Sequence, residues 1–119
     1  MDMSKYKTLL ADNIVAPMTQ FMQDCGDDCE FTQEDIQTCE NILLEYVESL
    51  AALSSPADKD IMECVKKAVL ALNELNENTD YALIETEERE NIWELIQTAA
   101  VDCGLQDPAD DVTEEWRDW

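Results

Sequence analysis

The clearest pattern in the sequence is a series of apolar residues at helical spacing over 32–53. Apolar side chains recur there every three or four residues, and glutamate and glutamine occupy many of the positions between them. This is the period of an amphipathic helix. Thr32 suits the N-cap, Asp35 stands three residues later, and Phe31 precedes the cap where it can pack on Ile36. The pattern predicts a helix long enough to cross a small domain.

A second helix is predicted over 56–76, directly after the first. Ser55 is expected to cap it, and Pro56 suits the first helical position because an N–H there would have no partner within the helix. Its apolar face would comprise Ile61, Cys64, Val65, Ala68, Leu72 and Leu75. The short connection requires the two helices to form an antiparallel hairpin.

Two further helices are expected, over 4–24 and 86–103. Pro17 interrupts the apolar stripe of the first and removes a backbone hydrogen bond, which predicts either a kinked helix or two short ones. Thr86 is the expected cap of the other helix. Residues 79–84, which precede it, form either a short strand or an extended link.

Composition supports a helical fold. The chain of 119 residues has 45% hydrophobic residues, enough to fill one core, and only 2 glycines and 3 prolines to make turns. Gly104 is the expected end of the last helix, and an acidic tail follows over 106–119. We predict an all-α fold, a single domain over 1–119 built as a bundle of four main helices with a short C-terminal tail or helical turn.

The charge of the chain is strongly negative. Its 29 acidic and 7 basic residues give a formal net charge of -22. Such a surface repels nucleic acid and anionic lipid and attracts basic proteins and divalent cations. The charge either serves solubility alone or is a recognition feature.

The cellular location is predicted from what the chain contains. The N-terminal segment has no apolar signal region, and no apolar run has the length of a membrane span. Cys39, Cys64 and Cys103 fall on apolar helical positions, which is typical of reduced, buried thiols. We therefore expect a cytoplasmic protein.

The residue inventory excludes several kinds of catalysis. The chain has no histidine, so it offers no His general base, no Cys-His or Ser-His pair and no His metal ligand. Two glycines cannot build a phosphate-binding loop. We predict a protein that is not an enzyme, with no catalytic residue and no cofactor.

One acidic loop raises the question of a metal or a disulfide. Cys25 and Cys29 lie four residues apart, and the sequence leaves open whether they pair. No second ligand pair with zinc spacing follows, and the glycine precedes the Asp pair, unlike the order in an EF-hand. No metal site is therefore expected.

The enzyme alternative is a magnesium site. Glu87 and Glu90 lie one turn apart, and Glu115 and Asp118 repeat the three-residue spacing. This arrangement resembles the Mg²⁺ site of the all-α nucleotide pyrophosphohydrolases, and the resemblance implies a Mg²⁺-dependent nucleotide pyrophosphohydrolase.

Two acidic patches are the candidate partner-binding residues. The first is the loop and helix start over 24–35, with Asp27, Asp28 and Glu30. The second combines the tail with the start of the fourth helix, through Asp110, Asp111, Glu114, Glu115, Glu87 and Glu88. Trp116 is expected to anchor the tail, and Trp119, at the chain end, is expected to be an exposed hot spot within an acidic rim.

The chain resembles the small acidic α-helical immunity and inhibitor proteins of bacterial toxin systems. The resemblance lies in the stretch 83–90 (LIETEERE) and the ending 111–116 (DVTEEW), and it extends as a type over the whole chain. It implies a protein that neutralises a basic partner, a bacterial toxin or nuclease, without binding nucleic acid or membrane. Two further functions fit the same acidic, helical pattern: a nucleic-acid mimic that inhibits a DNA-binding protein, and a homodimeric helical adaptor.

Overall fold

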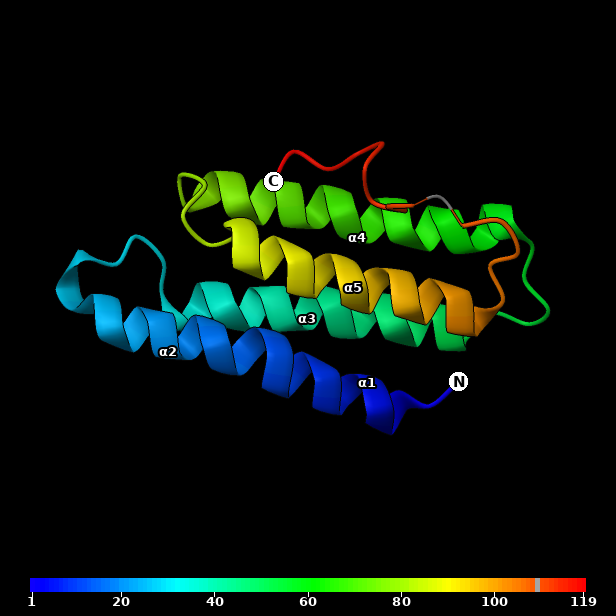
Figure 1. Cartoon of the computed structure of the whole chain (residues 1–119), viewed down its shortest axis with the longest axis horizontal. Coiled ribbons are helices and arrows are strands. Elements are labelled where there is room, and N and C mark those ends of the chain that lie inside the picture. The colour runs from blue at the N-terminus through cyan, green and yellow to red at the C-terminus, as the bar shows by residue number, and fades with distance from the viewer. Residues whose placement is uncertain (109) are drawn as a thin grey trace.

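The computed structural model describes residues 1–108 and 110–119, and in this part of the chain it contains helices and no strand. The elements, in order, are α1 (Met3–Leu10), η1 (Ala11–Val15), α2 (Ala16–Cys25), η2 (Gly26–Asp28), α3 (Gln33–Ala51), α4 (Asp58–Asn78) and α5 (Thr86–Cys103). Figure 1 shows α1, η1 and α2 running on as one rod, so the bundle has four main helices. The predicted all-α bundle is confirmed.

The N-terminal rod contains a π-helical turn instead of a sharp kink. Pro17 lies in the first turn of α2, directly after the π-helical η1. Because proline has no N–H and its ring crowds the preceding turn, a wider turn at that place lets the rod continue without a break. The rod is thus neither a kinked α-helix nor two separate helices.

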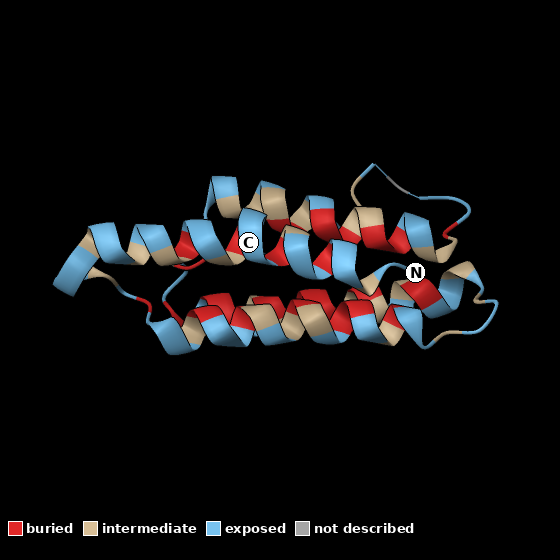
Figure 2. Cartoon of the chain, turned by 90° about the horizontal axis from the view of Figure 1, so that it is seen from below, coloured by how far each residue is buried: buried red, intermediate tan, exposed pale blue. Residues whose placement is uncertain are grey.

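The core lies between the facing sides of the helices. α3 and α4 run antiparallel, α5 runs beside them, and Figure 2 shows their buried faces turned inward. Ile36, Leu43, Ile61, Leu72 and Ile96 are fully buried. The predicted apolar face of α4 is buried except for Cys64, which is half-buried.

The first residues of α4 differ from the prediction. Ser55 has a φ of 48°, in the left-handed region, and does not cap the helix. Ala57 is the N-cap, and its N–H donates to the carboxylate of Asp60 at 3.1 Å. The predicted cap at Ser55 and start at Pro56 are therefore wrong, because the turn after α3 uses these residues before the helix can begin.

The other helix ends are closer to the prediction. Thr32 and Asp35 form the expected capping box at the start of α3. Gly104 ends α5 with a φ of 117°, a conformation that glycine adopts without steric cost. Thr86 is the first residue of α5 and Glu85 its N-cap, so the predicted cap at Thr86 is wrong by one residue.

Residues 79–84 form a link and not a strand. Asp80 and Tyr81 both have positive φ, at 57° and 64°, a conformation that costs side-chain-bearing residues energy. Asn76 holds this link. Its backbone carbonyl accepts from the Tyr81 N–H at 2.7 Å, and its buried side-chain Oδ1 accepts from the Ile84 N–H at 2.9 Å.

Replacing the Asn76 side chain tests this role. Asn76→Ala leaves the buried Ile84 N–H without its acceptor, which should lower the free energy of unfolding by about 1–3 kcal/mol. Asn78→Ala, at an exposed position of the same last turn, should change it by less than about 0.5 kcal/mol. Urea denaturation followed by circular dichroism measures both. Equal effects of the two substitutions would contradict the assignment.

Candidate partner-binding surface

One end of the bundle concentrates negative charge. α2 and α4 end there, and α3 and α5 begin there (Figure 1). The segments 24–35 and 74–90 that form this end carry thirteen carboxylates and a single base, Arg89. We call these two segments the acidic end. The carboxylates are therefore not spread evenly along the length of the bundle.

Helix stability does not explain all of these charges. Acids in the first turns of α3 and α5 are favourable, because a helix N-terminus carries partial positive charge. Asp24 and Glu77, in contrast, lie in the last turns of α2 and α4, where the dipole is negative and no basic residue is present. Each such charge opposes the dipole at a cost of about 0.3–1 kcal/mol. Helix stability therefore does not account for the position of these two charges.

A groove runs between the N-terminal rod and α5. Two adjoining hollows of about 470 and 130 Å³ share Asn13, Ile14 and Asn91 as lining residues. Their walls carry five carboxylates and, among the described residues, no basic side chain: Asp24, Glu85, Glu87, Glu88 and Glu94. Pro17 and the half-exposed ring of Phe21 add apolar surface. This acidic groove suits a cationic side chain with an apolar stem, as Lys and Arg have.

Glu88 is the most perturbed carboxylate of the groove. Partial burial raises its pKa, and the negative charges of Glu85 and Glu87 raise it further, although a backbone hydrogen bond acts in the opposite direction. Asp24 faces the same hollow from α2. A bound cation would relieve this repulsion and would therefore be favoured there.

The residues of the first predicted patch lie at the acidic end. Asp27, Asp28 and Glu30 are exposed on the loop between α2 and α3, and Glu87 and Glu88 lie in the first turn of α5. The structure groups α5's start with α2, in the acidic groove. Among the described residues, none that lines this groove belongs to the tail, which the second predicted patch combines with the start of α5.

The tail packs along the middle of the bundle. Its only residue outside the described ones is Ala109. The Val112 N–H donates to Gln97 Oε1 at 3.1 Å, and Gln97 lies ten residues after Glu87, or roughly 15 Å along α5. Val112 therefore lies away from the start of the helix, whereas the contact of Asp118 with Asn73 places Asp118 beside the acidic end.

The four tail acids of the second predicted patch differ in their surroundings. Asp110, Glu114 and Glu115 are exposed. Asp111 is half-buried and internally paired, since its carboxylate accepts from Arg117 Nη1 at 2.5 Å and from the Thr113 hydroxyl at 2.6 Å. Asp111 is therefore less available to a partner than the other three.

Trp119 is not the exposed anchor that its position at the chain end predicts. It is half-buried against the core, with the Arg117 guanidinium 5.4 Å from its ring centroid. Asn73 holds the tail beside it, donating to the Trp116 carbonyl at 2.7 Å and accepting from the Asp118 N–H at 3.1 Å. The exposure expected for Trp119 is wrong, and Trp116 packs on the core as expected.

Two other aromatic side chains, one at the acidic end and one directly before it, are exposed. Phe21 is 47% exposed and stacks on Phe31, with ring centroids 5.9 Å apart. Tyr81 is 51% exposed on the strained link. In the sequence, Phe21 belongs to the apolar stripe of the helix predicted over 4–24. The neighbouring Met22 can fill the same face, and this is the only sign in the sequence that the core does not need the ring of Phe21.

The carboxylates of the enzyme alternative are not brought together. Within residues 1–108 and 110–119, no group of three or more His, Cys, Asp or Glu side chains is arranged to hold a metal ion. Glu87 and Glu90 on α5 and Glu115 and Asp118 on the tail therefore form no common ligand set. Cys25 and Cys29 are free thiols within hydrogen-bonding reach of each other.

Comparisons with known proteins add no relative. No protein-family model matches the sequence, and searches of curated proteins and of solved structures found no significant match. Among the helices of the described residues, none combines the length and the apolar character needed to cross a membrane.

The raised pKa of Glu88 predicts a pH-dependent cost. The folded state holds this proton more tightly than the unfolded chain. Stability is therefore lost as the pH rises from the unfolded-state pKa of Glu88 to its raised folded-state pKa, and the full cost applies above that. Glu88→Gln should therefore give a small gain in unfolding free energy at neutral pH, and the gain should vanish in acid as Glu88 becomes protonated. Glu90→Gln, at an exposed position, is the control for removing one charge. Urea denaturation across pH measures both, and identical pH profiles would contradict the assignment.

Proposed function

We propose that this chain is a non-enzymatic binding protein that neutralises a basic protein, and that the acidic end with its groove is the binding surface. The observation that carries the proposal is the crowding of thirteen carboxylates with one base at that end. Several of these charges oppose the helix dipoles beside them. Lysines and arginines of a partner would offset this unfavourable interaction of the carboxylates with the helix dipoles, and the offset would favour binding.

The groove supports a defined mode of contact. The field of the acidic end would speed the encounter with a cationic protein, as charge complementarity does in other complexes. Lysine or arginine side chains would then enter the groove beside Glu85, Glu87 and Glu88, and the exposed rings of Phe21 and Tyr81 would supply the apolar contacts. Nucleic acid and anionic lipid would be repelled by the same field.

The resemblance to immunity proteins makes a bacterial toxin or nuclease, met in the cytoplasm, the class of partner we favour. Such a protein acts by covering the active site or an adjacent surface of its target. If the partner is instead a DNA-binding enzyme, the carboxylates would stand in for phosphates, and duplex DNA would compete for the same partner surface.

Two triple variants of equal charge locate the surface. The product of the neighbouring reading frame is the first partner to test, and its affinity should fall steeply as salt rises. Glu85→Gln, Glu87→Gln and Glu88→Gln together should weaken binding by roughly a hundredfold or more, since two lost close charge pairs at about 1.5 kcal/mol each account for that. Asp110→Asn, Glu114→Gln and Glu115→Gln remove three exposed tail charges and should change it by less than about threefold.

Calorimetry or a surface binding assay at low and high salt measures these affinities. Equal losses in the two triple variants would show that total charge alone matters, and the acidic groove would then not be the site. A larger loss in the tail variant would move the site to the tail. An affinity that does not change with salt would contradict the electrostatic basis of the proposal.

A further inference from the structure

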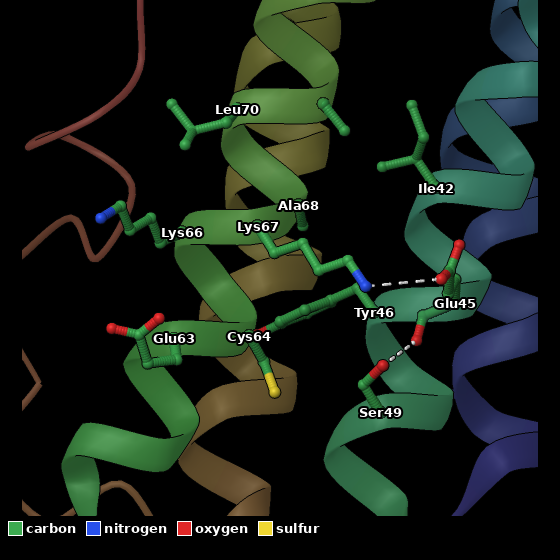
Figure 3. A pocket seen from close by; sticks show the side chains of 11 residues that line it. Ile42, Glu45, Tyr46, Ser49, Glu63, Cys64, Lys66, Lys67, Ala68 and Leu70 are labelled. Carbon is green, nitrogen blue, oxygen red and sulfur yellow. Dashed lines mark hydrogen bonds and ion pairs between the residues drawn. The ribbon is translucent and has the colours of Figure 1, made fainter.

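A second hollow, which we call the hairpin groove, lies between α3 and α4. It has a volume of about 590 Å³ and is lined by side chains of both helices (Figure 3). Ile42 of α3 and Leu70 of α4 are among its lining residues, and Tyr46 lies buried between the helices. Leu70 is 46% exposed. An exposed apolar groove of this kind is a typical contact site.

The charges around this hairpin groove are balanced. Two acidic residues, Glu45 and Glu63, and two basic ones, Lys66 and Lys67, line it. The charged residues described in the lining of the acidic groove are all carboxylates. Lys67 reaches across from α4 to Glu45 of α3, with Nζ and Oε1 3.7 Å apart (Figure 3). Both side chains are more than two-thirds exposed, so this ion pair is weak and its members are free to pair elsewhere.

We propose that the hairpin groove is the contact between two copies of this chain in a two-fold dimer. Two chains of net charge -22 repel each other over most of their surfaces. They can approach where the local charge is balanced, and in a two-fold contact the same face meets itself. The lysines of one copy would then meet the glutamates of the other, and each Leu70 would enter the groove of the opposite copy.

Electrostatics also selects the orientation of the dimer. A two-fold axis along the helices would place the two acidic ends side by side. An axis perpendicular to the helices makes the two α4 helices antiparallel and sends the acidic ends to opposite ends of the assembly. The molecule is 47 Å long, several times the screening length of about 8–10 Å at moderate salt, so the repulsion is then largely screened. Both acidic ends stay exposed in this arrangement.

The test is the mass in solution as a function of protein concentration. Sedimentation equilibrium should show a rise from the 13.6 kDa monomer toward twice that mass, at lower concentration in high salt because salt screens the repulsion. Leu70→Glu should weaken the dimer at least about tenfold, which is 1.4 kcal/mol. Val101→Glu is the matched control, because Val101 is 45% exposed on α5 outside the groove and gains the same charge.

A charge swap tests the pairing itself. Lys66→Glu with Lys67→Glu should dissociate the dimer, and adding Glu45→Lys and Glu63→Lys to the same chain should restore it. Circular dichroism checks that every variant keeps its helices. A monomer mass at all concentrations in high salt would overturn the proposal, and so would equal effects of Leu70→Glu and Val101→Glu. Failure of the swap to restore the dimer would overturn the proposed pairing.

Discussion

The structure depends on an apolar core that holds the helices together against the repulsion among their carboxylates. The core is continuous, from Tyr6 in the first helix to Val112 in the tail. Within the described residues three ion pairs neutralise only three of the 29 acids, and they involve Lys5, Lys67 and Arg117. The pairs of Lys5 and Lys67 are exposed and contribute little to stability, so burial of apolar side chains supplies most of it. Each further carboxylate adds repulsion, and a crowded group of them calls for an explanation other than folding.

Apolar periodicity was enough to predict the helices, because burial on one face is a local pattern with a fixed period. The starts of α4 and α5 were harder to predict. Ser55 is a good cap by residue type, but the short turn after α3 gives it a left-handed backbone that cannot cap a helix. The sequence also left open whether 79–84 is a strand or a link. The Ile84 N–H finds its acceptor in the buried side chain of Asn76 and not in a neighbouring strand. Conformations of two or three residues decide such details.

The candidate site was predictable only in part. The acidic loop 24–35 and the start of α5 are visible as local runs of charge. That Asp24 and the start of α5 line one groove follows from how the N-terminal rod packs on α5. Trp119 was misplaced because the amide of Asn73, forty-six residues earlier, holds the tail against α4. Phe21 shows the converse error. It belongs to an apolar stripe, but α2 projects beyond the start of α5 (Figure 1). Phe21 therefore stays 47% exposed, although Phe31 stacks on its ring.

The two proposed contacts require different charge distributions in the two grooves. Long-range attraction of a cation needs net negative charge and gains from every added carboxylate, whereas contact between two copies needs a face on which charges cancel. Lys66 and Lys67 lie in the half of α4 away from the acidic end, and they create such a face without reducing the field where the carboxylates gather. Lysines moved to the acidic end would relieve repulsion and stabilise the monomer, but they would weaken the attraction there. Stability and the proposed binding thus favour opposite charge distributions at that end, and the observed distribution is the one that the proposed binding requires.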